Sequence, residues 1–101
     1  MIAEERFQPY RDELVAFCRR NRIRRLSIFG SALRADFGPD SDIDVLVEFE
    51  AGHVPGLEFF GMAEELSQLF GRRVDFVTER GLNRHIRERV LDEARPLYDA
   101  A

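Results

Sequence analysis

The stretch "FGSALRADFGPDSDIDVLVEF", Phe29–Phe49, decides the fold of this chain. A Gly-Ser pair follows a short apolar segment near its start, and an Asp-x-Asp pattern opens an apolar strand near its end. Because burying charge is costly, two carboxylates at the mouth of such a strand need an explanation. Successive side chains of a strand point to opposite faces. Asp42 and Asp44 therefore share one face, and the apolar residues that alternate with them share the other.

The shared face of these aspartates predicts a metal site. Same-face neighbours lie roughly 7 Å apart along a strand, and two carboxylates at that separation repel each other unless a cation lies between them. Hard oxygen ligands favour Mg²⁺. A third carboxylate, Asp75, lies inside a later apolar run that contains no cation. If that run forms a strand beside the first, Asp42, Asp44 and Asp75 make a triad able to hold two Mg²⁺ ions.

The Gly-Ser pair, Gly30-Ser31, lies where a strand leads into a helical turn expected from Ala32 to about Phe37. Glycine lets the backbone approach a ligand closely, the first N–H groups of a helix are free, and the serine hydroxyl adds a donor. The pair therefore predicts a phosphate cradle, and Arg34 can reach the same phosphates. A cradle beside an acid cluster, without a Ser-His-Asp or Cys-His set, indicates phosphoryl or nucleotidyl transfer.

Helical and strand patterns alternate along the chain, which indicates an α/β sheet with helices packed on it. Apolar residues at three- and four-residue steps predict helices at about 4–20, 60–70 and 82–94. Short apolar runs predict strands at 26–29, 42–49 and 73–77. Phe60 and Ile86 are expected on the buried stripes of their helices, Gly71 is expected as a C-cap, and the last helix is expected to end before Pro96.

The composition bounds the kind of protein. The 101 residues, 45% of them apolar, fit one domain, 1–101, with a packed core. A single cysteine, no apolar run near the roughly 20 residues of a membrane helix and an N-terminus without a signal region indicate a soluble, cytoplasmic protein. The formal charge of −4 argues against a protein that coats nucleic acid, and no direct DNA binding is expected. Five arginines from Arg19 to Arg25 are either solvated cations at a helix end or a contact patch for RNA or an acidic partner.

The spacing of the two motifs resembles that of a known family. Gly30-Ser31, ten further residues and then Asp42-Ile43-Asp44 match the GS-x10-DxD signature of the nucleotidyltransferase superfamily that includes DNA polymerase beta. The small size, the run "DSDIDVLVEF" and the later "RRVDFVTERGL" resemble its minimal nucleotidyltransferase (MNT) branch, from about Leu26 to the C-terminus. The resemblance implies a small mixed β-sheet flanked by helices.

The resemblance also implies roles for individual residues. Asp42 and Asp44 would bind both metals, and Asp75 would bind the metal that activates the acceptor hydroxyl. The residues assigned to ATP are Gly30, Ser31, Arg34 and Ser41. MNT proteins commonly act as the antitoxin of a HEPN ribonuclease toxin, and some transfer AMP from ATP to a tyrosine of that toxin.

Three functions stay open at this point. The intact triad favours Mg²⁺-dependent transfer of AMP to a hydroxyl of a partner protein. An antitoxin that neutralises its toxin by binding alone is favoured by Ala35, because relatives often carry glycine after the motif arginine. A small-molecule or RNA nucleotidyltransferase is the third, and about a hundred residues leave little room for its acceptor domain. The acceptor site is therefore expected to be completed by another protein, in a homo- or hetero-oligomer.

Overall fold

The computed structural model describes residues 5–34, 38 and 40–100, and these form a four-stranded sheet of order β3-β2-β1-β4. β1 pairs antiparallel with β2 and with β4, whereas β2 pairs parallel with β3. The sheet is mixed, as expected. In chain order the elements are the 3₁₀ helix η1 (Glu5–Tyr10), α1 (Arg11–Arg20), β1 (Ile23–Phe29), the 3₁₀ helix η2 (Gly30–Leu33), β2 (Ile43–Phe49), α2 (Glu58–Phe70), β3 (Val74–Thr78), α3 (Arg84–Glu93) and β4 (Arg95–Asp99).

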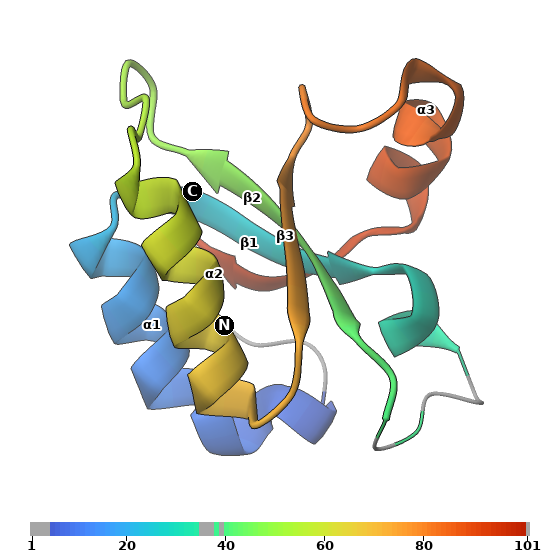
Figure 1. Ribbon diagram of the computed structural model, residues 1–101, viewed down its shortest axis with the longest axis horizontal. Helices are drawn as coiled ribbons and strands as arrows, with labels where there is room; N and C mark the ends of the chain where they lie inside the picture. Colours follow the sequence, from blue (N-terminus) through green and yellow to red (C-terminus); the bar gives the residue numbers. More distant parts are fainter. Residues whose placement is uncertain (1–4, 35–37, 39, 101) are drawn as a thin grey trace.

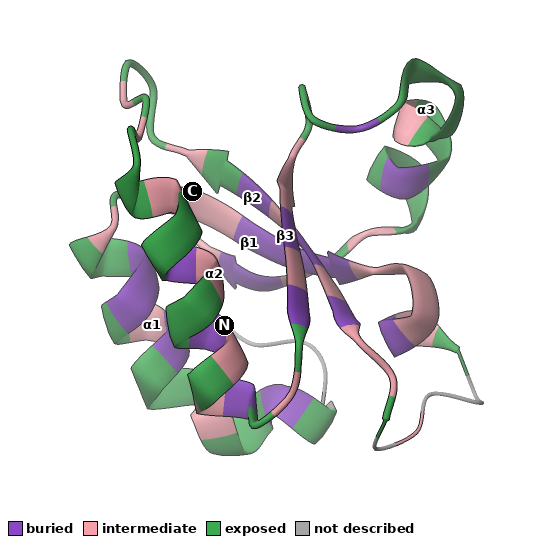
Figure 2. Cartoon of the chain, viewed as in Figure 1, coloured by how far each residue is buried: buried purple, intermediate pink, exposed green. Residues whose placement is uncertain are grey.

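Two of the helices form a layer on the sheet and the third stands apart. α1 and α2 lie side by side, while α3 lies at the other end of the sheet, between β3 and β4 in the chain (Figure 1). The core lies between the two-helix layer and the sheet face that carries Ile28 and Val45, which pair across β1 and β2 and are both fully buried. Buried residues recur along α1, α2 and the strands between exposed ones (Figure 2). In the described residues, no helix is long and apolar enough to cross a membrane.

The first helix is shorter than its apolar spacing predicts. The chain forms the 3₁₀ helix η1 up to Tyr10, and the regular α-helix begins only at Arg11. Pro9 lies inside η1, and since proline has no N–H to donate, it disfavours the interior of an α-helix. The expected buried stripe is nevertheless present, because Leu14, Phe17 and Cys18 are all nearly inaccessible to solvent.

In α2 the C-cap prediction is confirmed, and the predicted buried stripe is corrected at its first residue. Gly71 adopts a left-handed backbone with φ of 70° and donates its N–H to the Ser67 carbonyl at 2.9 Å, closing the helix. Phe60, however, is 72% exposed. Phe59 packs against the core instead, and the buried side chains of α2 are Met62, Leu66 and Phe70. Phe60 is the one misplaced member of the predicted stripe, because the other members lie in the core or pack against it: Ala63, Leu66, Leu69 and Phe70.

A fourth strand, β4, was not predicted. α3 ends before Pro96 as expected, but the residues that follow return to the sheet and pair with β1. Leu97 is fully buried and Tyr98 is 9% exposed. β4 is an edge strand, and an edge tolerates proline because its missing N–H need not face a neighbouring strand.

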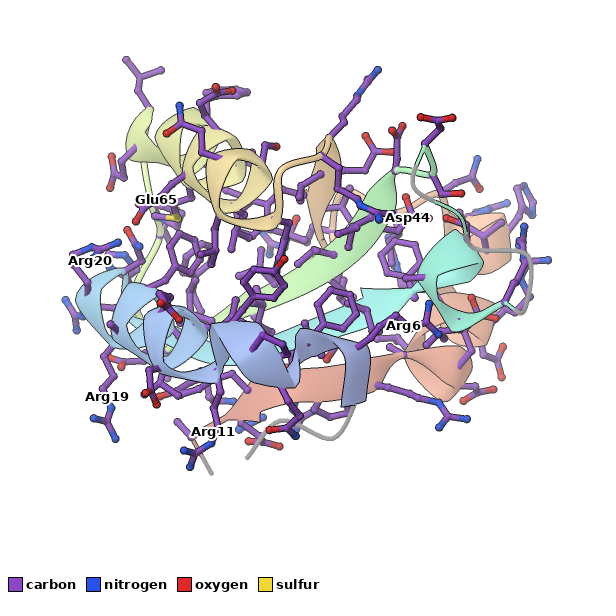
Figure 3. All side chains as sticks on the ribbon, turned by 90° about the horizontal axis from the view of Figure 1, so that it is seen from below. Arg6, Arg11, Arg19, Arg20, Asp44 and Glu65 are labelled. Atoms are coloured by element: carbon purple, nitrogen blue, oxygen red, sulfur yellow. The ribbon has the colours of Figure 1, made fainter. Side chains whose placement is uncertain are left out.

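The arginines from 19 to 25 are largely paired within the chain. The ion pairs are Arg20–Glu65, Arg22–Glu50, Arg24–Glu48, and Arg25 with both Glu48 and Asp99. Exposed pairs of this kind add little stability, but they offset the local positive charge. Arg19 and Arg20 also lie at the end of the molecule away from Asp44 (Figure 3). This arrangement favours the interpretation of the cluster as solvated surface cations.

Candidate active site

The parallel pairing of β2 and β3 brings the central carboxylates together. Asp44 lies directly opposite Asp75 in the register of the two strands. Paired residues of neighbouring strands point to the same face, and α2 supplies the connection that a parallel pair requires. The two strands are therefore neighbours, as the triad hypothesis requires.

The Gly30-Ser31 turn closes against the same carboxylate. Gly30 has φ of 64°, a conformation that favours glycine, and a Cβ at this position would overlap Asp44 Oδ2 and lie 3.3 Å from Asp44 Cγ. The Ser31 N–H donates a hydrogen bond to the Asp44 carboxylate. The Ser31 hydroxyl donates to the backbone oxygen of Asp42 at 3.1 Å. The turn and the Asp-x-Asp motif thus form one connected unit.

The surroundings of Asp44 disfavour its charged form. Burial raises the pKa of Asp44 above the usual range of aspartate, and the charge of Asp75 raises it further. The hydrogen bond from the Ser31 N–H lowers the same pKa, whereas a hydrogen bond with Asp75 and the charge of Asp42 raise it. The neighbouring acids therefore disfavour the charged form of Asp44 in the folded chain.

A cation does accompany Asp75, contrary to the sequence-based expectation. Arg73 precedes Asp75 by two residues, and its Nε lies 4.0 Å from Asp75 Oδ1 and 3.9 Å from Asp42 Oδ2. The Arg73 side chain is 76% exposed, so water screens the attraction and its contribution to stability is small. The signal was present in the sequence, since residues two apart on a strand share a face.

The backbone N–H groups of the turn are already engaged, and not free as expected. The Gly30 N–H donates to Glu93 Oε1 at 3.2 Å, and the Ser31 N–H donates to Asp44. The expected helical turn is the four-residue 3₁₀ helix Gly30–Leu33, and residues 35–37, with Ala35 among them, lie outside the described residues. Both N–H groups therefore donate to carboxylates of the same chain, and the binding of phosphate by this turn stays a prediction.

A pocket of about 320 Å³ opens beside this turn. Gly30, Arg34 and Asp44 line it from the sheet side, so the structure brings these three predicted residues together. The opposite wall is α3, which sequence analysis did not assign to the site. Its contributing residues are Ile86, Arg89, Val90 and Glu93. The prediction that Ile86 is buried is wrong, because this side chain is 36% exposed. The 3.6-residue spacing of the apolar residues predicts which side chains share one face of α3, but it does not predict that this face lines a pocket.

Ser41 has a structural position in the loop before β2. Its hydroxyl accepts the Gly38 N–H at 3.1 Å, and its own N–H donates to the Gly38 carbonyl at 3.1 Å. Arg72 Nη1 donates to the carbonyl oxygens of Gly38 at 2.8 Å and of Ser41 at 3.1 Å. Ser41 is not among the residues that line the pocket, and its contact with a nucleotide stays a prediction.

The chemistry of the acid cluster fits a divalent cation. The available donors are carboxylate oxygens, which Mg²⁺ prefers, and their mutual repulsion is relieved when a cation binds between them. Within the described residues, no three acidic, histidine or cysteine side chains already converge on a common point. To hold a cation together with Asp44, the side chains of Asp42 and Asp75, 44% and 48% exposed, would have to rotate toward it.

Comparison with known proteins agrees with this fold. The chain belongs to the nucleotidyltransferase domain family, whose profile matches residues 11–97. Its resemblance to minimal nucleotidyltransferases is confirmed, since a solved structure described as one has a TM-score of 0.74 and 41% identity and covers 92% of this chain and 94% of its own. A protein adenylyltransferase of Thermococcus cleftensis, MntA, is 40% identical over 72 residues, which is 70% of this chain and 71% of the relative.

A more distant structure shares the fold. The MNT antitoxin in complex with the tri-AMPylated HEPN toxin of Shewanella oneidensis has a TM-score of 0.65 and 20% identity, covering 91% of this chain and 71% of that one. The adenylyltransferase relative and the family profile together make this chain an enzyme of the nucleotidyltransferase class.

Proposed function

We propose that this chain is an Mg²⁺-dependent protein adenylyltransferase, which transfers AMP from ATP to a hydroxyl of a partner protein. The observation that carries the proposal is the β2–β3 register that sets Asp44 opposite Asp75, with the Gly30-Ser31 turn closed on the same carboxylate. An acid cluster next to a turn that accepts anions is what a metal-bound nucleoside triphosphate requires.

The residues divide between the metal and the phosphates. Asp42, Asp44 and Asp75 would hold two Mg²⁺ ions, which when bound neutralise phosphate charge and activate the acceptor hydroxyl. The Gly30-Ser31 turn would donate hydrogen bonds to the outer phosphates, and Arg34, which lines the same pocket, would add positive charge.

The transfer balances as a single displacement. The acceptor oxygen attacks the α-phosphorus of ATP, the bond between that phosphorus and the bridging oxygen to the β-phosphate breaks, and pyrophosphate leaves. The hydroxyl proton passes to a carboxylate of the cluster, for which Asp75 is the candidate because its side chain is half-exposed and within reach of an incoming group.

The relatives support the choice of acceptor and partner. MntA, 40% identical to this chain, is named a protein adenylyltransferase, and the Shewanella oneidensis neighbour is an antitoxin bound to an AMPylated HEPN toxin. We infer that the partner of this chain is a HEPN-type toxin, that a tyrosine of the toxin is the acceptor, and that the two proteins meet in the cytoplasm as a hetero-oligomer.

An antitoxin that acts by binding alone is the second candidate. The observation in its favour is that Glu93 occupies the Gly30 N–H, which a phosphate would need. The two functions differ in whether the toxin is altered covalently.

The proposal is tested by co-expressing the chain with the HEPN-type protein that co-purifies with it. With ATP and Mg²⁺, the mass of the partner should rise by whole adenylate units, and Asp44→Asn should abolish the rise. An unchanged mass, together with neutralisation of the toxin by both the parent chain and Asp44→Asn, would refute the enzymatic function and establish the binding one.

A further inference from the structure

One face of α3 forms a wall of the pocket, although none of its residues belongs to the Gly-Ser or Asp-x-Asp motifs. Ile86, Arg89, Val90 and Glu93 follow one another at steps of three, one and three residues and line the pocket together. Such spacing places side chains on a single helix face. This face carries one positive and one negative side chain, Arg89 and Glu93, one helical turn apart.

Glu93 stands where the outer phosphates of a nucleotide would bind. Its Oε1 accepts the Gly30 N–H at 3.2 Å, and a single N–H cannot give a straight hydrogen bond to a carboxylate and a phosphate oxygen together. Even after the N–H has changed partner, the carboxylate and the phosphate carry like charges at close range. Glu93 therefore opposes phosphate binding at this turn.

Arg89 has the opposite sign and is available to a ligand. It lines the same pocket as Arg34, and neither arginine forms an ion pair with a residue that the structure describes. Guanidinium groups bind phosphate oxygens with charge-assisted, often bidentate hydrogen bonds. A triphosphate bound in this pocket beside the Gly30 turn would have both Arg34 and Arg89 in its walls.

We propose that α3 completes the phosphate subsite with two side chains of opposing effect: Arg89 binds the outer phosphates, and Glu93 competes with them for the Gly30 N–H. The inference rests on the proposed function, because it concerns the same nucleotide, and it adds residues that the signature motifs do not contain. Nucleotide binding displaces the Glu93 carboxylate from the turn and brings Arg89 into contact with phosphate.

The test compares two α3 variants with two matched controls. Arg89→Gln and Glu93→Gln change the pocket face, while Arg84→Gln and Asp92→Asn make the same charge changes on α3 residues that do not line the pocket. Calorimetry measures the affinity of each purified chain for a non-hydrolysable ATP analogue and for inorganic tripolyphosphate, both with Mg²⁺. All four side chains are exposed, and a thermal melt of each variant verifies that it is folded.

We expect Arg89→Gln to weaken both ligands about tenfold, the effect of losing one charge-assisted hydrogen bond. Glu93→Gln should tighten both about three- to tenfold, because a like charge leaves the subsite. The controls should change either affinity less than about twofold.

The inference is wrong if either α3 variant shifts affinity no more than its control, or if Arg89→Gln weakens the ATP analogue but not tripolyphosphate. If the unaltered chain binds both ligands and the α3 variants bind them equally well, this inference is overturned and the proposed function still stands. Failure of the unaltered chain to bind either ligand would overturn both.

Discussion

Replacement of Gly30 by alanine measures the contact between the turn and the acid cluster. A left-handed backbone costs a non-glycine residue about 1 kcal/mol, and Gly30 has φ of 64°. The added Cβ would overlap Asp44 Oδ2, so the carboxylate must move and lose its hydrogen bond from the Ser31 N–H, at a cost of about 1–2 kcal/mol. We expect Gly30→Ala to lower the free energy of unfolding by about 2–3 kcal/mol, and the Tm by roughly 10–20 °C for a domain of this size.

Gly71→Ala separates the two parts of this effect. Gly71 has φ of 70°, nearly that of Gly30, but a Cβ there would meet nothing within 4 Å. Gly71→Ala should therefore lower the free energy of unfolding by only about 1 kcal/mol, the cost of a left-handed backbone at a non-glycine residue. In a double-mutant cycle, Asp44→Ala removes the overlapping carboxylate, so Gly30→Ala should cost about 1–2 kcal/mol less in that background.

Urea denaturation of the four chains, followed by circular dichroism, gives the free energies of unfolding. Equal losses in Gly30→Ala and Gly71→Ala, or a cycle with no coupling to Asp44, would refute the contact as described. A transfer assay on Gly30→Ala should show little activity, because the displaced carboxylate belongs to the proposed metal site.

Three further predictions concern the carboxylates. The pKa of Asp44 is raised in the folded chain, so the folded state binds more protons than the unfolded state above about pH 4, and stability is lost as pH rises through the raised pKa. Asp44→Asn should remove this loss of stability with rising pH. If the free energies of unfolding of the variant and the parent differ by the same amount at every pH, the pKa of Asp44 is not raised in the folded chain. Millimolar Mg²⁺ should raise the Tm by binding only the folded chain, with Asp42→Asn blunting the rise; flat melts would argue against a metal site. Asp75→Asn should keep much of the affinity for Mg·ATP but lose roughly two to four decades of transfer rate, whereas equal losses in calorimetry and in the transfer assay would place Asp75 in the nucleotide site.

Features that depend on neighbouring residues could be predicted from the sequence. The common face of Asp42 and Asp44 follows from the two-residue period of a strand, and the left-handed Gly71 follows from the way helices commonly end. The pairing of Asp44 with Asp75 needed one added assumption, that the two strands are neighbours, and the register confirms it.

Features that depend on distant contacts could not be predicted in the same way. The residues after Pro96 form a strand because β1 offers a free edge about seventy residues earlier in the chain, and no local pattern records that edge. The apolar spacing on α3 fits a buried stripe and a pocket wall equally well, so the partial exposure of Ile86 and the contact of Glu93 with Gly30 needed the structure. Phe59 and Phe60 are adjacent and chemically identical, and only the tertiary fold decides which one faces the core.

The parallel pairing of β2 and β3 also governs when the site exists during folding. Asp44 and Asp75 are separated by α2 in the chain and meet only after β3 has docked at the edge of the sheet. Closing such a long loop is slow compared with forming a local hairpin or helix, and an edge strand can open locally while the remaining core persists. Catalytic competence is therefore tied to the docking of β3, so mild denaturation that frees this edge strand should silence the enzyme before the cooperative loss of its helices.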